Sequence, residues 1–294
     1  MKKFLIAAST AVGMSAIATA PGFAYTITGE KDAWLYDNNY GSCGANSTCL
    51  TNDMSRLDAI LGGNSSAPGG NVELFATSEG VTLANFQNSG RTSIEGTVAG
   101  KSLTLSSLTY SDWFDTGSGV TTQYGANNLA NKWFNDFYKA AGLETTLGLA
   151  AREMAYAAYL GDNVKGFQRT SDPNISYVTT SGSDLLIGLA GHYDAKAFYS
   201  SMLGPFGSLI KNGFQVSEVV KVNYGGVEDF LYSFSATETN LLEVGDGKSH
   251  SGNYEVALKG VVPPAASVPE PSVVFGLIGL GGLLAAKRKQ QQAE

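Results

Sequence analysis

The chain holds two histidines, His192 and His250, and this scarcity limits its catalytic chemistry. A Ser/His/Asp hydrolase needs a histidine beside a nucleophile and an acid, and Asp194 follows His192 two positions later in GHYD. Serines are so common here that this proximity identifies no triad, and we expect His192 to lie in a helix. The sequence also lacks a GxSxG elbow, an HExxH pair and a GxGxxG loop after a strand. We therefore assign no catalytic residue and favour a protein that is not an enzyme.

Carboxylates give the alternative chemistry. Asp112, Asp115, Glu144 and Glu153 would supply the acid and the base of a secreted carbohydrate-active enzyme. Such an enzyme needs two carboxyl groups on facing elements, about 5 to 10 Å apart in a cleft. Whether any pair meets this condition depends on the fold.

Exposed aromatic residues would favour a third class, a carbohydrate-binding module, because flat rings stack on sugars. Two aromatic groups lie in polar surroundings, Trp34 with Tyr36 and Tyr40, and Trp113 with Phe114. Trp133 is instead expected in the core of a helix. The alternative, which we favour, is that most of these rings simply fill the core.

Two stretches near the N-terminus gather side-chain oxygens, which calcium prefers as ligands. They supply Asp37, Asn38 and Asn39 from the first stretch, and Asn52, Asp53 and Asp58 from the second. Neither has the spacing of an EF-hand loop, and Asp and Asn in loops commonly cap turns. We assign no metal and no cofactor.

Cys43 and Cys49 are the only cysteines, in the loop sequence GSCGANSTC. The spacing does not fit a CxxC redox centre, and a zinc site would need more Cys or His nearby. In an oxidising compartment the two thiols are expected to form a local disulfide that closes this loop.

Strands are predicted at both ends of the body, where apolar residues alternate with polar ones. They fall within 72–110, 216–224, 227–239 and 253–262. Two hairpin turns are predicted, at 99–102 and at 225–226.

Between the strands, an apolar residue recurs every three or four positions, which predicts helices. They cover 127–142, 143–161, 184–193 and 194–203. The fold class is therefore α+β: an antiparallel β-rich domain over 25–260 with a central helical block, which packs on one face or protrudes as a cap.

The first residues have the layout of a secretory signal peptide. Lys2 and Lys3 precede an uncharged run from 4 to 24, and Ala24 and Gly22 offer small residues before a cut. We expect a signal helix over 1–24, export through the Sec machinery, and a mature start at Tyr25.

At the other end, residues 271–286 carry no charge. As a helix they would span about 24 Å, slightly less than the roughly 30 Å hydrocarbon core. Lys287, Arg288 and Lys289 follow at once and would act as stop-transfer charges on the cytoplasmic side. We expect a single C-terminal transmembrane helix.

Three features occur in order at this end: the triplet Pro269, Glu270 and Pro271, then a Gly/Leu-rich run, then KRK. Together they resemble the bacterial PEP-CTERM sorting signal, within 269–294 only. The resemblance implies that a membrane-embedded exosortase reads the triplet and cleaves the tail. The prolines keep this segment extended, and 261–268 would be a Pro-containing spacer.

The charge composition of the exported body limits the classes of partner that it is expected to bind. Residues 1–24 contain two lysines, and residues 269–294 contain three basic residues and two glutamates. Without them, the 19 Lys+Arg and 26 Asp+Glu of the chain become 14 and 24, a net charge near −10 for the exported body. This argues against nucleic acid as a partner. We expect a cell-surface or extracellular-matrix protein, anchored by its C-terminal segment until the tail is cut, with an exopolysaccharide as a further candidate partner.

Overall fold

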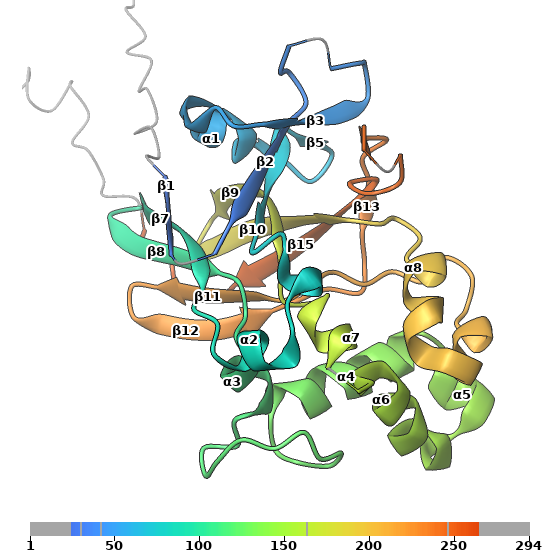
Figure 1. Ribbon diagram of the computed structural model, residues 1–294. Coiled ribbons are helices and arrows are strands. Elements are labelled where there is room, and N and C mark those ends of the chain that lie inside the picture. Colours follow the sequence, from blue (N-terminus) through green and yellow to red (C-terminus); the bar gives the residue numbers. More distant parts are fainter. Residues whose placement is uncertain (1–24, 30, 42, 163, 246, 265–294) are drawn as a thin grey trace, which may run out of the picture.

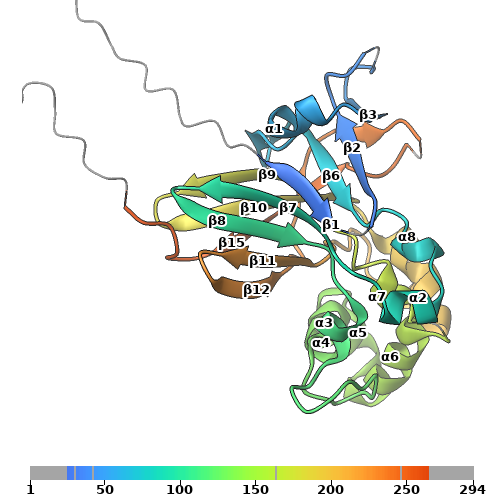
Figure 2. The same ribbon diagram turned by 60° about the vertical axis from the view of Figure 1, so that its left-hand side comes forward.

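The computed structural model describes residues 25–264, except 30, 42, 163 and 246. It is a mixed α+β structure in which two antiparallel-rich sheets pack face to face and a helical block lies at one end of them (Figures 1 and 2). The predicted signal peptide, residues 265–268 of the spacer, the Pro269–Pro271 triplet and the expected transmembrane segment lie outside the described residues. Within the described part, no helix is long and apolar enough to cross a membrane.

The larger sheet has eight strands and brings the two ends of the body together. In spatial order the strands are β13 (Thr237–Glu238), β15 (Gly252–Leu258), β10 (Asp184–Gly191), β9 (Asn174–Ser181), β6 (Gly70–Leu74), β2 (Ala33–Asp37), β3 (Ser47–Thr51) and β14 (Leu242–Glu243). Neighbours run antiparallel except β14 and β3, which are parallel. Strands from the N-terminal and C-terminal parts of the body therefore lie in one sheet.

The smaller sheet has five strands. Their order is β1 (Thr26–Gly29), β7 (Thr92–Val98), β8 (Lys101–Ser106), β11 (Val220–Tyr224) and β12 (Val227–Leu231). Alternation turns Leu103 and Leu105 of β8 inward, where they join Val72 and Ile187 of the larger sheet in one buried cluster. Burial of this interface holds the two sheets together.

The helices form a second, aromatic core. They are α1 (Leu57–Ile60), α2 (Leu83–Gln87), α3 (Tyr110–Phe114), α4 (Leu129–Ala140), α5 (Leu143–Leu147), α6 (Arg152–Leu160), α7 (Lys165–Gln168) and α8 (Lys196–Ser200), with 3₁₀ turns η1 (Met54–Arg56), η2 (Ser78–Gly80), η3 (Leu149–Ala151) and η4 (Ser201–Leu209). A short ribbon of β4 (Gly63–Asn64) and β5 (Ala67–Pro68) completes the elements. Helices α3 to α8 surround Trp113, Trp133 and Phe167, whose side chains are fully buried.

Several predicted elements are confirmed. Helix α4 lies inside 127–142, begins after Asn128, whose side chain accepts from the Asn131 amide, and is followed by Gly142 at φ 77°. Turns connect β7 to β8 at 99–100 and β11 to β12 at 225–226, both as predicted.

One predicted helix is wrong, and two others are interrupted. Residues 184–191 form strand β10 in the centre of the larger sheet, because both neighbouring strands supply backbone partners to an apolar run that fits either structure. The helix over 143–161 is broken at Gly148, whose φ of 71° and ψ of −177° are not helical. Its inward face also differs: Tyr156 and Tyr159 are buried, while Met154 is 65 % exposed. The helix over 194–203 is divided between α8 and the first residues of η4, and the backbone leaves the helical region at Gly204 (φ 52°, ψ −123°), just before Pro205.

A candidate acidic binding pocket

A cavity of about 260 Å³ lies where the larger sheet meets the helical block. Strands β2 and β6 supply Trp34, Tyr36 and Glu73, and helix α8 supplies Phe198 and Tyr199. The remaining wall comes from the segments just before β9 and β11, from the end of β10 and from the loop after β14. We refer to this cavity as the acidic pocket.

Three carboxylic acids define the pocket chemically: Glu73, Asp172 and Glu218. Asp172 precedes Pro173, which biases it to extended backbone, and the Pro173 carbonyl accepts from the Leu74 amide of β6. The Val219 amide donates to the Thr170 carbonyl, which holds Glu218 beside the same segment. Backbone hydrogen bonds therefore bring acids from three distant parts of the chain together.

The environment of each acid favours its neutral form. Burial, and then the charges of Glu243, Glu79 and Asp32, raise the pKa of Glu73 to about 8. Burial and the neighbouring Glu218 and Glu73 carboxylates raise the pKa of Asp172 well above its usual range. Burial and the Glu73 charge do the same to the pKa of Glu218.

Neutral hydrogen-bond donors orient these acids. The Ser78 hydroxyl donates to Asp172 Oδ2 at 2.6 Å. The Asn174 backbone and side-chain amides donate to Glu218 Oε2 at 3.0 and 3.2 Å. Asp172 is only 4 % exposed, and its Oδ1 has no hydrogen-bond partner in the described part of the chain. One acceptor of the pocket is therefore desolvated and unused.

A buried hydrogen-bond chain continues from Asn174 to His250. The Asn71 side-chain amide donates to Asn174 Oδ1 at 2.6 Å and lies 3.3 Å from His250 Nε2. The other ring nitrogen of His250, Nδ1, lies 2.7 Å from Thr48 Oγ1. His250 also adopts φ 68°, a left-handed conformation. Tertiary contacts fix this imidazole against the pocket.

Aromatic rings form the other side of the pocket. Trp34 is 40 % exposed at its edge, while Tyr36 and Tyr199 are buried. The His192 ring packs against Phe198 at a centroid distance of 4.9 Å. The described residues that line the cavity include no Lys or Arg. Arg169, which is not a lining residue, pairs with Glu79 at 3.0 Å and lies over Phe198.

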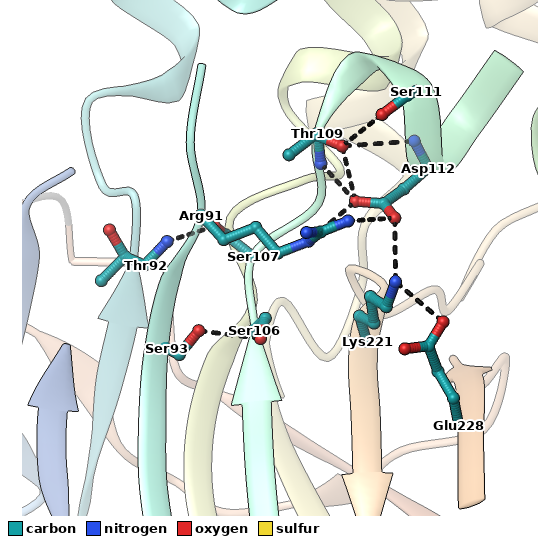
Figure 3. A network of polar contacts seen from close by, with 10 residues as sticks. All are labelled: Arg91, Thr92, Ser93, Ser106, Ser107, Thr109, Ser111, Asp112, Lys221 and Glu228. Atoms are coloured by element: carbon teal, nitrogen blue, oxygen red, sulfur yellow. Dashed lines mark hydrogen bonds and ion pairs between the residues drawn. The ribbon is translucent and has the colours of Figure 1, made fainter. Parts of the chain in front are cut away.

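The carboxylates named from the sequence do not lie in this pocket. Asp112 instead joins a network between α3 and the smaller sheet, where Arg91 donates to both of its oxygens and Lys221 Nζ lies 3.2 Å away (Figure 3). Lys221 also pairs with Glu228 at 2.8 Å. Burial acts to raise the pKa of Asp112, but hydrogen bonds from Arg91 and Thr109 outweigh it and hold this pKa below its usual range.

The other three acids are also distant from the pocket. Asp115 is exposed and accepts from the Gly117 amide in a turn. Glu144 pairs with Arg152, and Glu153 is exposed on α6. These four positions therefore offer no pair of facing carboxyls in a cleft.

The two aromatic groups named from the sequence have different positions in the structure. Trp34 is solvent-facing and borders the pocket with Tyr36, whereas Tyr40 is 41 % exposed outside it. Trp113 and Phe114 offer no stacking surface, because both are fully buried in the helical core with Trp133, which agrees with the favoured interpretation that most of these rings fill the core. His192 follows strand β10 and is not in a helix.

The predicted disulfide is present, with Cys43 and Cys49 Cα atoms 5.8 Å apart. The oxygens near it serve local structure: Asp37 pairs with Arg56 at 2.6 Å, Asp53 caps η1, and Asp58 accepts from the Tyr25 amide. Among the described residues, no group of three or more His, Cys, Asp or Glu is placed to hold a metal ion.

Sequence reasoning missed all three pocket acids. Glu73 gave a detectable signal, a charge inside the apolar strand sequence NVELF that alternation turns away from the inner core. Asp172 lies in a connecting segment without a pattern, and Glu218 lies in the predicted strand 216–224, just before β11 begins, so only the tertiary structure reveals them.

Comparisons with protein-family models, with curated proteins and with solved structures find no match for this chain. Its chemistry therefore has to be inferred from the pocket itself.

Proposed function

We propose that the body, residues 25–260, is a carbohydrate-binding protein whose ligand stacks on Trp34 and enters the acidic pocket. The observation that carries this proposal is the junction of an exposed Trp34 ring with buried hydrogen-bonding groups in one small cavity. A sugar has an apolar face of C–H groups and a rim of hydroxyls, which an aromatic ring and carboxyl or amide groups complement.

The test is binding of the full chain to an array of oligosaccharides, followed by calorimetry on those retained. Trp34→Ala is expected to weaken binding at least tenfold. Tyr40→Ala is the matched control, since Tyr40 is equally exposed but lies outside the pocket. Absence of binding to every sugar, or an equal effect of both substitutions, would reject the proposal.

A second candidate is hydrolysis of a glycosidic bond, favoured by the raised pKa values of the pocket acids. A carboxylic acid that stays protonated near neutral pH can donate its proton to the departing glycosidic oxygen, while an ionised neighbour activates water to add to the sugar carbon. Release of reducing ends from a bound oligosaccharide, lost in both Asp172→Asn and Glu218→Gln, would establish this activity. Binding without release would leave a binding protein.

For the chain as a whole, we propose export by the N-terminal signal and sorting to the cell surface through the Pro269–Pro271 triplet. The order of triplet, apolar run and Lys287–Lys289 cluster supports this proposal. Expression in hosts with and without an exosortase, followed by intact mass and fractionation, tests it. Loss of the tail only when the enzyme is present is the expected result. An unchanged mass in both hosts, with the protein in the membrane, would instead make 271–286 a permanent anchor.

A further inference from the structure

We infer that the sugar bound in the acidic pocket carries a protonated amine, which lies against Asp172, Glu218 and Glu73. The ligand class is thus an amino sugar with a free ammonium group. This inference rests on the proposed function and names the chemistry of its ligand.

The charge of the lining points to a cation. Five carboxyl groups line the cavity, from Glu79, Glu243 and the three acids named above, and its described lining residues include no Lys or Arg. Glu79 is paired with Arg169 at the edge. Neutral groups donate hydrogen bonds to the other three acids: the Tyr36 hydroxyl to Glu73, the Ser78 hydroxyl to Asp172, and Asn174 to Glu218. Neighbouring carboxylates repel one another, and either protonation or a bound cation removes this repulsion.

An unused acceptor gives independent support. Asp172 Oδ1 is buried, lines the pocket and has no hydrogen-bond partner among the described residues. A buried acceptor without a partner costs free energy, which a ligand N–H group would recover. An ammonium offers three such donors in one compact group.

The aromatic side of the pocket suits an organic cation better than a metal ion. Trp34, Tyr36 and Tyr199 surround the same space, and ring faces attract ammonium groups. By contrast, the described residues contain no group of three or more potential ligands arranged for a metal. The sugar ring would stack on the aromatic side of the pocket while its amine pairs with the carboxylates on the acidic side.

The experiment is calorimetry of the full chain, at about pH 6.5 so that the sugar amine is protonated. The four probes are the trimer of glucosamine, the trimer of N-acetylglucosamine, a neutral glucose trimer and 1,4-diaminobutane. The glucosamine trimer is expected to bind at least tenfold more tightly than each of the others.

Asp172→Asn tests the pairing directly, because it keeps the shape of the side chain but removes its capacity for negative charge. We expect it to weaken glucosamine-trimer binding at least tenfold and to leave the circular dichroism spectrum unchanged. Asp162→Asn, at an exposed acid outside the pocket, is the control and should leave binding unchanged.

The outcomes separate the inference from the proposed function. Equal affinity for the amine and the acetylated trimer would overturn the inference and keep a sugar-binding pocket. If the diamine binds as tightly as the glucosamine trimer, the sugar rings contribute nothing to the affinity, and an amino sugar is overturned as the ligand. Absence of binding to all four probes, with sugars of the array also unbound, would overturn both.

Discussion

Both the backbone amide and the side-chain amide of Asn174 donate to one oxygen of Glu218, at 3.0 and 3.2 Å. Asn174 opens strand β9 and Glu218 precedes β11, so the contact links the two sheets at the floor of the pocket. Because Asn174 also accepts from Asn71, which contacts His250, the position of Glu218 depends on residues from four separate parts of the chain.

Replacement of Glu73 should change how stability depends on pH. The folded-state pKa of about 8 lies above the ordinary value of 4.5, so the folded protein holds a proton that the unfolded chain releases. The free energy of unfolding therefore falls as pH rises from about 4.5 to about 8. Glu73→Gln removes this contribution and should raise stability near pH 8, by at most on the order of 4 kcal/mol, with little effect near pH 4.

Denaturant titrations of the variant and the wild type across this pH range measure the difference. Because the Glu73 charge also raises the pKa values of Asp172 and Glu218, the difference includes the altered titration of these two neighbours. Glu153→Gln, on the exposed face of α6, serves as control. A stability difference independent of pH would show that Glu73 is already ionised in the folded state.

Asp112→Asn should have the opposite pH dependence. The pKa of Asp112 is held below 3.8, so its contribution to stability is present above that value and is lost as pH falls through the folded-state pKa. At about pH 7 the substitution leaves Arg91 and Lys221 without their shared anion (Figure 3) and should cost about 2–4 kcal/mol. Thermal or denaturant unfolding at neutral and acid pH tests this. An equal loss at both would assign the effect to packing.

Removal of the disulfide between Cys43 and Cys49 should destabilise the loop before strand β3 and the start of that strand. The double variant Cys43→Ser, Cys49→Ser is expected to lose about 2 kcal/mol, the chain-entropy value for so small a ring. Denaturant unfolding with and without a reducing agent measures it. The reductant should lower the stability of the wild type by a similar amount and leave the double variant unchanged. A response of the double variant to the reductant would contradict the assignment.

Gly70 should tolerate no side chain. It has φ 152°, and a Cβ added there would lie 2.0 Å from the Tyr36 carbonyl oxygen of the paired strand β2. Gly70→Ala should therefore cost more than about 3 kcal/mol or prevent folding, because the backbone of β2 would have to move. At Gly80 an added Cβ meets nothing within 4 Å, so Gly80→Ala should stay within about 0.5 kcal/mol of the wild type. Soluble yield and denaturant unfolding measure both.

The sequence by itself determined the elements whose signals are local. Helix α4 follows from its apolar spacing and its Asn128 cap, the 99–100 and 225–226 turns from their glycines, which accept positive φ, and the disulfide from two thiols six positions apart. The α+β class followed from the order of these elements.

Only the tertiary structure decided the features that depend on distant partners. Residues 184–191 became a strand because β9 and β15 flank them, which overrode a helical spacing. Trp113 became core and Trp34 surface although both lie in polar sequence. The acidic pocket has no sequence signature, because Glu73, Asp172 and Glu218 meet only when β6, β9 and β11 are held together by the sheets, and the burial that raises their pKa values exists only in the folded chain.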